Sequence, residues 1–226
     1  ATMVLTPRFS VLDSLGDYAE VRRLLVFGTR VSVWLSCFIS QCLILLGPAF
    51  IGRWMGVPFQ NISSPVLIIL ALPLPLFLAH SVSARVLYGI GRVRPFATTT
   101  AICAILNLGL SLFLVQHWGI AGVAVGTAIP CLVQVLVIAC IVCRATELPL
   151  WRFFQQAYLA PLCGATVATL IWLGILIFFA LDSYLSILCA GIIGLGLNLA
   201  LALLFDRELS QRVRGKVKVL RHQQDH

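Results

Sequence analysis

The side chains that could do chemistry in this chain are a few polar residues set inside long apolar runs. Arg30 is the most distinctive, because it lies about one and a half turns into the apolar run 24–46. A charge inside a membrane span is costly and often marks a substrate path, although an arginine near the end of a span can extend its guanidinium back to the head groups. A guanidinium binds phosphate through paired hydrogen bonds. Arg30 therefore predicts either such a snorkelling residue or a site for an anionic ligand.

Further polar residues within the apolar runs are His80, Gln41, Asn107, Gln134 and Asn198. Residues of this kind usually form hydrogen bonds between membrane helices. His80 is the best candidate ligand among them, because it shares a run with Pro73 and Pro75 and lies about one turn from Arg85. The two prolines free backbone carbonyls that a cavity or a neighbouring helix must satisfy, and a packed kink is the favoured interpretation. The candidate substrate-binding residues are Arg30, His80, Arg85 and Asn107.

The sequence shows no pattern typical of catalysis or metal binding. All eight acidic residues lie at the ends of apolar runs or between them, so we expect no buried carboxylate of the kind that proton- or sodium-coupled pumps use. The eight cysteines lie in apolar runs, where free cysteine packs as a small hydrophobe. Cys140-x-x-Cys143 has no second pair or histidine cluster that would complete a metal site. We therefore expect a protein that is not an enzyme and that uses no metal and no cofactor.

The composition indicates the environment in which these residues act. Of the 226 residues, 60% are hydrophobic and 11% are charged, and the mean hydropathy is +1.02. Soluble domains are about half apolar and about one quarter charged. A net charge of +8 is compatible with nucleic-acid binding, but the charges separate apolar runs and form no basic face. We expect an all-α, polytopic membrane helical bundle whose partner is the lipid bilayer, with no nucleic acid.

Six apolar runs are long enough to cross a bilayer as helices, since about twenty helical residues span the hydrocarbon core. They are residues 24–46, 65–88, 97–116, 120–143, 159–181 and 185–205. Short polar turns join several of these spans, which predicts antiparallel hairpins. The chain thus divides into a cytoplasmic amphipathic link, a six-helix transmembrane lobe and a basic cytoplasmic tail, at 1–23, 24–205 and 206–226. The intervening segment 47–64, rich in proline, glycine and aromatic residues, is predicted to be interfacial or re-entrant.

The basic residues predict the orientation of these spans. The turn from Arg85 to Pro95 holds three arginines between two apolar runs. If this turn lies in the cytoplasm and successive loops alternate sides, 14 of the 16 Lys and Arg residues fall on the cytoplasmic side. Cytoplasmic loops carry such an excess of Lys and Arg. We therefore predict cytoplasmic N- and C-termini in a multi-pass protein of the cell inner (plasma) membrane.

Several motifs, taken in order, resemble those of one transporter superfamily. The first are similar to the link midway through flippases of the multidrug/oligosaccharidyl-lipid/polysaccharide superfamily: PRFS at 7–10, GD at 16–17 and RRL at 22–24. Others are similar to the polysaccharide-biosynthesis branch, at 45–51, 87–92, 107–108 and 119–127. In the last segment, Gly122 and Gly126 stand at a spacing that lets helices approach closely. The resemblance covers residues 7–144.

The resemblance implies a transporter of two six-helix lobes, of which this chain is the C-terminal part. The first seven residues, which have no initiator Met and no signal peptide, also predict a piece of a longer protein. The implied function is export of a lipid-linked oligosaccharide for surface polysaccharide biosynthesis, from the cytoplasmic to the periplasmic leaflet. The implied partners are a polyprenyl-pyrophosphate-linked glycan and the missing N-terminal lobe, since alternating access needs two bundles. The family's cavity is commonly lined by basic residues, a role that Arg30 matches in kind.

Three alternative functions stay open at this point. A drug/cation antiporter of the same superfamily would carry an acidic residue in the missing half. A membrane-embedded polysaccharide polymerase or glycosyltransferase would gather polar residues on a large outer loop, for which segment 47–64 is the sole candidate. A scaffold subunit would recruit soluble enzymes through the basic tail, although this tail is more simply an anchor that binds anionic lipid.

Overall fold

The computed structural model describes residues 5–178, 183–206 and 211, and the regular structure in this part of the chain is helical. This confirms the all-α prediction, whereas most of the predicted basic tail lies outside the described residues. The elements are α1 (Leu5–Ser14), α2 (Tyr18–Leu45), α3 (Gly47–Met55), α4 (Val57–Ala71), α5 (Leu74–Gly89), α6 (Val93–Ala145), α7 (Leu150–Phe154), the π-helical segment η2 (Gln155–Leu159), α8 (Ala160–Ile177) and α9 (Tyr184–Phe205).

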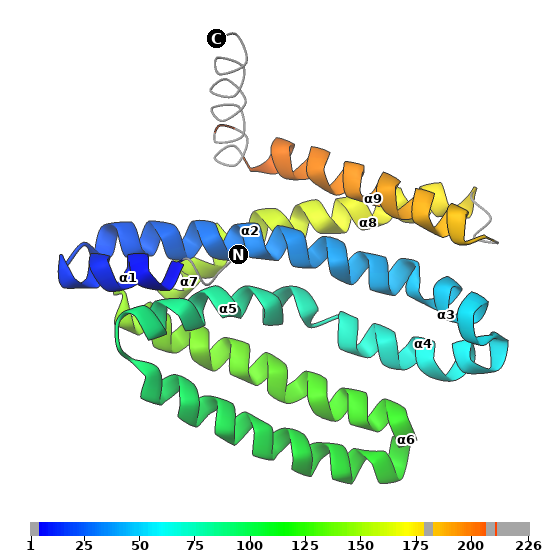
Figure 1. Ribbon diagram of the computed structural model, residues 1–226, viewed down its shortest axis with the longest axis horizontal. Helices are drawn as coiled ribbons and strands as arrows, with labels where there is room; N and C mark the ends of the chain where they lie inside the picture. The colour runs from blue at the N-terminus through cyan, green and yellow to red at the C-terminus, as the bar shows by residue number, and fades with distance from the viewer. Residues whose placement is uncertain (1–4, 179–182, 207–210, 212–226) are drawn as a thin grey trace.

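Five helical stretches of the described chain are long and apolar enough to cross a membrane: α2, α4 with α5, α6, α7 with α8, and α9. The longest is α6, whose 53 residues would extend about 80 Å, far more than the ~30 Å of a bilayer core. It bends at Gly119, which has the non-helical angles φ 57° and ψ −138°, and it returns beside its own first half (Figure 1). Because each half of α6 is long enough to cross the membrane, the five stretches account for the six predicted spans.

Glycines hold the two halves of α6 together. A Cβ added at Gly122 would come within 2.5 Å of the Leu114 carbonyl carbon, and one at Gly126 within 2.7 Å of the Ser111 backbone nitrogen. Neither position has room for a larger residue unless the backbones separate. The structure therefore confirms the predicted close helix approach through Gly122 and Gly126 and assigns it to the α6 hairpin.

The first helix packs onto the bundle and is not merely a surface element. Phe9 of α1 is fully buried, and a Cβ at Gly89 of α5 would lie 2.5 Å from the Phe9 Cβ. The chain then turns at Gly16, whose φ of +68° favours glycine, and Asp17 caps α2 by accepting the Glu20 N–H at 3.1 Å. Residues 18–23, which we expected in the amphipathic link, form the first turns of the spanning helix α2.

The second span is broken between α4 and α5, where Pro73 and Pro75 lie. Because Pro75 has no N–H, the Ala71 carbonyl four residues earlier loses its helical donor. Ser40 Oγ of α2 donates to that carbonyl oxygen at 2.6 Å. A neighbouring helix thus satisfies the break, which confirms the packed-kink interpretation.

The segment between the first two spans forms α3 and the beginning of α4, with a turn at Gly56 (φ +89°). Trp54 of α3 is 69% exposed, as expected for an aromatic anchor at the membrane interface. The aromatic ring of Tyr184, at the start of α9, lies edge-on to Phe50 of α3, so α3 covers one end of the bundle. Of the two predicted arrangements for this segment, the short helix fits an interfacial one.

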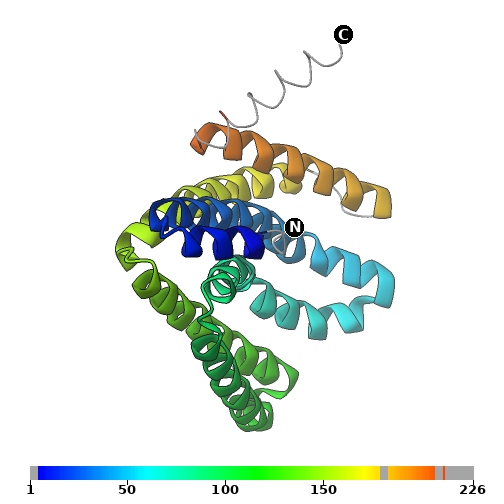
Figure 2. The same cartoon turned by 60° about the vertical axis from the view of Figure 1, so that its left-hand side comes forward.

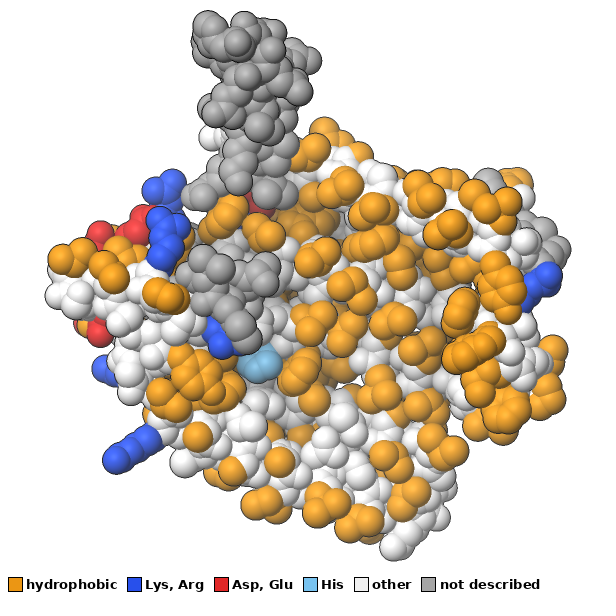
Figure 3. Space-filling view, viewed as in Figure 1, with side chains coloured by type: hydrophobic (Ala, Val, Ile, Leu, Met, Phe, Trp, Pro, Cys, Tyr) orange, Lys and Arg blue, Asp and Glu red, His pale blue; other side chains and the backbone are white. Residues whose placement is uncertain are grey.

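The helices run roughly parallel to one another in layers, with α8 and α9 on one side of α2 and with α4, α5 and the α6 hairpin on the other (Figures 1 and 2). Apolar side chains cover most of the visible face between the two ends of the helices (Figure 3). Basic and acidic side chains gather at the end that carries α1 and the α5–α6 turn. The bundle therefore has one strongly charged end and an apolar middle.

Candidate functional site

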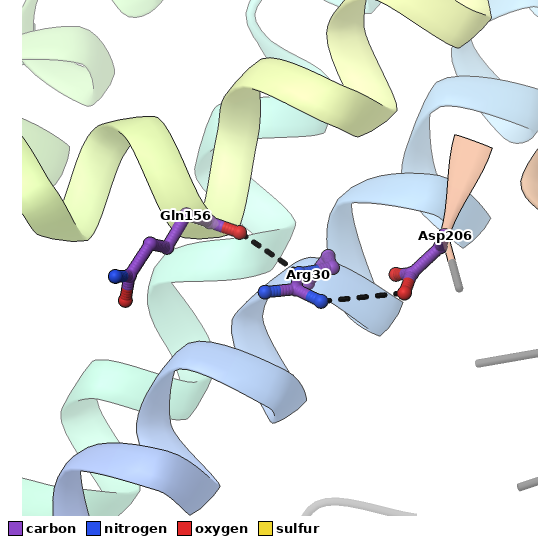
Figure 4. Close-up of polar contacts among 3 residues, drawn as sticks. All are labelled: Arg30, Gln156 and Asp206. Carbon is purple, nitrogen blue, oxygen red and sulfur yellow. Dashed lines mark hydrogen bonds and ion pairs between the residues drawn. The ribbon is translucent and has the colours of Figure 1, made fainter. Parts of the chain in front are cut away.

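The guanidinium of Arg30 connects three separate parts of the bundle. Its Nε donates to the Gln156 carbonyl oxygen at 2.8 Å, and its Nη1 lies 3.3 Å from Asp206 Oδ1 (Figure 4). Arg30 belongs to α2 and Gln156 to η2, and Asp206 is the residue directly after α9. The Arg30 side chain is 17% exposed and that of Asp206 only 1%. We predicted that Arg30 either snorkels or binds a ligand; the structure shows that it also has an internal counter-ion, Asp206.

The sequence explains why the Gln156 carbonyl is available to Arg30. In a π-helix each carbonyl bonds to the N–H five residues later, and five residues after Gln156 is Pro161, which has no N–H. The carbonyl oxygen therefore needs another donor. Arg30 Nε supplies it, so the arginine satisfies a backbone group as well as a carboxylate.

Asp206 corrects the expectation that no acidic residue is buried. It lies at the end of an apolar run, as predicted, but its residue is 3% exposed, so the carboxylate is enclosed. The sequence held a signal that we did not use: an acid at a helix C-terminus is disfavoured by the helix dipole. Asp206 directly after Phe205 therefore implies a nearby cation, which the structure identifies as Arg30.

His80 and Arg85 both lie on α5 and are half-buried. His80 Nδ1 is engaged with the Phe77 carbonyl oxygen, and its ring packs 4.8 Å from that of Phe77. The described residues provide Arg85 with no hydrogen-bond or ion-pair partner. Of the predicted basic candidates, Arg85 is thus the one for which the described part of the chain supplies no partner.

Asn107 lies inside the α6 hairpin. Its Oδ1 accepts from Ser111 Oγ at 3.1 Å and from Thr127 Oγ1 at 3.5 Å. A second bond of this type runs from Gln134 Nε2 to Thr100 Oγ1 at 3.0 Å. Asn107 and Gln134 thus each connect the two halves of α6, which is the interhelical role that such residues usually have.

Gln41 and Asn198 form a buried polar chain between three helices. Asn198 Nδ2 of α9 donates to Gln41 Oε1 of α2 at 2.8 Å, and Gln41 Nε2 donates to the Ala165 carbonyl oxygen of α8 at 2.8 Å. Both residues are less than one-tenth exposed. The predicted interhelical hydrogen bonds of these two residues are therefore present.

The four predicted substrate-binding residues lie on three elements: Arg30 on α2, His80 and Arg85 on α5, and Asn107 on α6. Within the described residues, no hydrogen bond or ion pair joins any two of them. Arg30, His80 and Asn107 already have internal partners, whereas the described residues give Arg85 none; the two guanidiniums carry the positive charge of the set. The chemistry that this arrangement supports is electrostatic binding of an anionic group.

An all-α bundle of apolar, bilayer-length helices with most of its visible charges at one end is a polytopic membrane protein. Residues 1–194 match the family model described as lipid II flippase MurJ, and the chain belongs to this family. The flippases of that family are transporters within the multidrug/oligosaccharidyl-lipid/polysaccharide superfamily, as the motifs predicted.

A solved structure shows the same fold. The inward closed conformation of lipid II flippase MurJ superposes with a TM-score of 0.70 over 92% of this chain, at 19% sequence identity. The chain covers 43% of that protein, so it spans less than half the length of its structural relative. No curated protein matches the chain.

Proposed function

We propose that this chain is the C-terminal lobe of a flippase that moves a lipid-linked oligosaccharide across the membrane for surface polysaccharide biosynthesis. The observation that carries the proposal is the family match over residues 1–194, together with a fold shared over 92% of the chain. The substrate is a polyprenyl-pyrophosphate-linked glycan, the class to which lipid II belongs. An N-terminal lobe of the same protein completes the transport path, because alternating access needs two bundles that move about a central site.

The charge distribution supports a cytoplasmic origin for the substrate. The charged end of the bundle lies at α1 and the α5–α6 turn (Figure 3). We place this end at the cytoplasmic face of the inner membrane, where basic loops are favoured, with both chain ends on the same side. Anionic lipids that approach from that leaflet then meet basic side chains first.

Within the lobe, Arg85 is the residue that first contacts the pyrophosphate, and Arg30 contacts it deeper in the membrane. Arg85 has no ligand in the described part of the chain, and Arg30 retains 17% of its side-chain surface. Arginine is suited to this role because its planar fork pairs with phosphate oxygens. His80 and Asn107 shape the path through the contacts they already make and do not bind the pyrophosphate directly.

The test is leaflet transfer by the full-length parent protein in vesicles. A labelled polyprenyl-pyrophosphate oligosaccharide is placed in one leaflet, and its arrival in the other is measured for the wild type and the variants Arg85→Ala and Arg30→Ala. We expect transfer by the wild type and at least a roughly ten-fold loss for Arg85→Ala, in line with the loss of a charge-assisted bidentate contact.

Arg53→Ala is the matched control, because Arg53 lies on α3, away from both candidate arginines. It should transfer lipid at the wild-type rate. If correctly inserted wild-type protein moves no labelled lipid, the flippase proposal is wrong. Normal transfer by Arg85→Ala would instead refute the role given to Arg85.

A further inference from the structure

The two side chains of the ion pair at the end of α9, Arg30 and Asp206, differ in exposure. The Asp206 side chain is 1% exposed and that of Arg30 is 17% exposed. Part of the arginine is therefore accessible from outside the bundle, whereas the carboxylate is not. The negative charge of Asp206 nonetheless acts on any anion bound there, because electrostatic screening is weak in a buried site.

The contact between the two groups is also long. Nη1 and Oδ1 are 3.3 Å apart, whereas strong charge-assisted bonds of this type measure about 2.7–2.9 Å. The guanidinium carries five N–H donors in a fixed fork, and its Nε is held by the uncharged Gln156 carbonyl. Arg30 is thus oriented from two sides, and 17% of its side chain stays exposed.

We infer that Asp206 is a positioning residue that holds Arg30 in place and limits how tightly the lobe binds a lipid pyrophosphate. This inference rests on the proposed flippase function. A transporter must bind its substrate strongly enough to load it and weakly enough to release it. Asp206 repels the phosphate charge across the guanidinium, so it favours release and raises turnover.

The critical variant is Asp206→Asn, which keeps an oxygen that can accept from Arg30 Nη1 but removes the charge. The probe is farnesyl pyrophosphate, and its dissociation constant is measured by calorimetry with the full-length protein in detergent. We expect roughly ten-fold tighter binding for Asp206→Asn, which is the effect of removing one charge at about 7 Å in a partly buried site. Leaflet transfer by the same variant should be slower than wild type, because release becomes limiting.

Three comparisons separate this role from a merely structural one. Asp206→Glu should bind the probe like the wild type, and the double variant Arg30→Ala/Asp206→Asn should lose the gain in affinity. Farnesol, which has the same hydrocarbon chain without phosphates, should bind the wild type, Asp206→Asn and Asp206→Glu equally. A structural defect would weaken or leave unchanged the binding of the charged probe and would not tighten it.

The outcomes are distinct from those of the transport test. Unchanged or weaker binding of farnesyl pyrophosphate by folded Asp206→Asn overturns the inference, even if the wild type transfers lipid normally. A wild-type protein that binds no probe overturns it as well. Tighter binding that persists in the double variant also contradicts it, because the gain would not then depend on Arg30.

Discussion

The most demanding test of the packing is a pair of glycine substitutions on α9. Trp172 of α8 is fully buried, and a Cβ added at Gly194 would lie 2.5 Å from its Cε2 and still closer to two other ring atoms. Non-bonded carbon atoms normally stay about 3.5–4.0 Å apart. The ring would therefore have to move by about 1 Å or more, and Phe38, stacked on it at 6.4 Å and 14°, resists that movement.

The control position lies two residues away. A Cβ at Gly196, on the same helix, would meet nothing within 4 Å. Overpacking a core costs about 1–3 kcal/mol, whereas replacing glycine by alanine inside a helix gains up to about 1 kcal/mol. Both variants share this gain, so we expect Gly194→Ala to be less stable than Gly196→Ala by about 1–3 kcal/mol, the overpacking cost alone.

The assay is unfolding of the full-length protein by a denaturing detergent, followed through tryptophan fluorescence. Trp172→Leu should rescue Gly194→Ala in part, because the smaller side chain leaves room for the new Cβ. It should not improve Gly196→Ala. Equal stability of the two alanine variants would refute the tight packing of α8 on α9.

Three further substitutions test local backbone features. Gly119→Ala should destabilise the α6 hairpin by about 1–3 kcal/mol, because alanine is strained at φ 57° and ψ −138°; unfolding measurements that show no loss would contradict the bend. Ser40→Ala should cost about 1 kcal/mol by leaving the Ala71 carbonyl unsatisfied, and Ser40→Thr, which retains a hydroxyl, should recover more stability than Ser40→Val. Glu147→Gly should gain about 1 kcal/mol, since Glu147 has φ 54°; a less stable variant would show that its side chain matters more than its backbone.

Much of the architecture could be predicted because the length of the apolar runs and the position of the basic residues between them determine membrane spans independently of tertiary contacts. Six runs and their short turns indicated an all-α membrane bundle, and Gly122 and Gly126 indicated a close helix approach. The extent of the second span could not be predicted in this way. We expected this span to begin at residue 65, whereas α4 begins at Val57 and contains Pro58 in its first turn, where a missing N–H has no consequence, and Pro65 in its interior.

The surroundings of Arg30 were harder to predict because they depend on contacts across the bundle. Its partners Gln156 and Asp206 lie 126 and 176 residues away in the sequence. Hydropathy identifies a charge inside a span but does not identify which charge neutralises it. The position of Asp206 at a helix end is a local sign of a nearby cation, but the need of the Gln156 carbonyl for another donor follows only from the π-helical segment η2, which the sequence did not predict.

The Ser40 bond at the break between α4 and α5 has a consequence for biogenesis. Inside lipid an unsatisfied carbonyl costs several kcal/mol, so the Ala71 carbonyl is satisfied only once Ser40 lies beside it. Ser40 belongs to α2, which precedes the break in the sequence and leaves the ribosome first. The order of synthesis therefore supplies the hydrogen-bond donor before its acceptor arrives, and α2 serves as an intramolecular template for insertion of the helix that follows it.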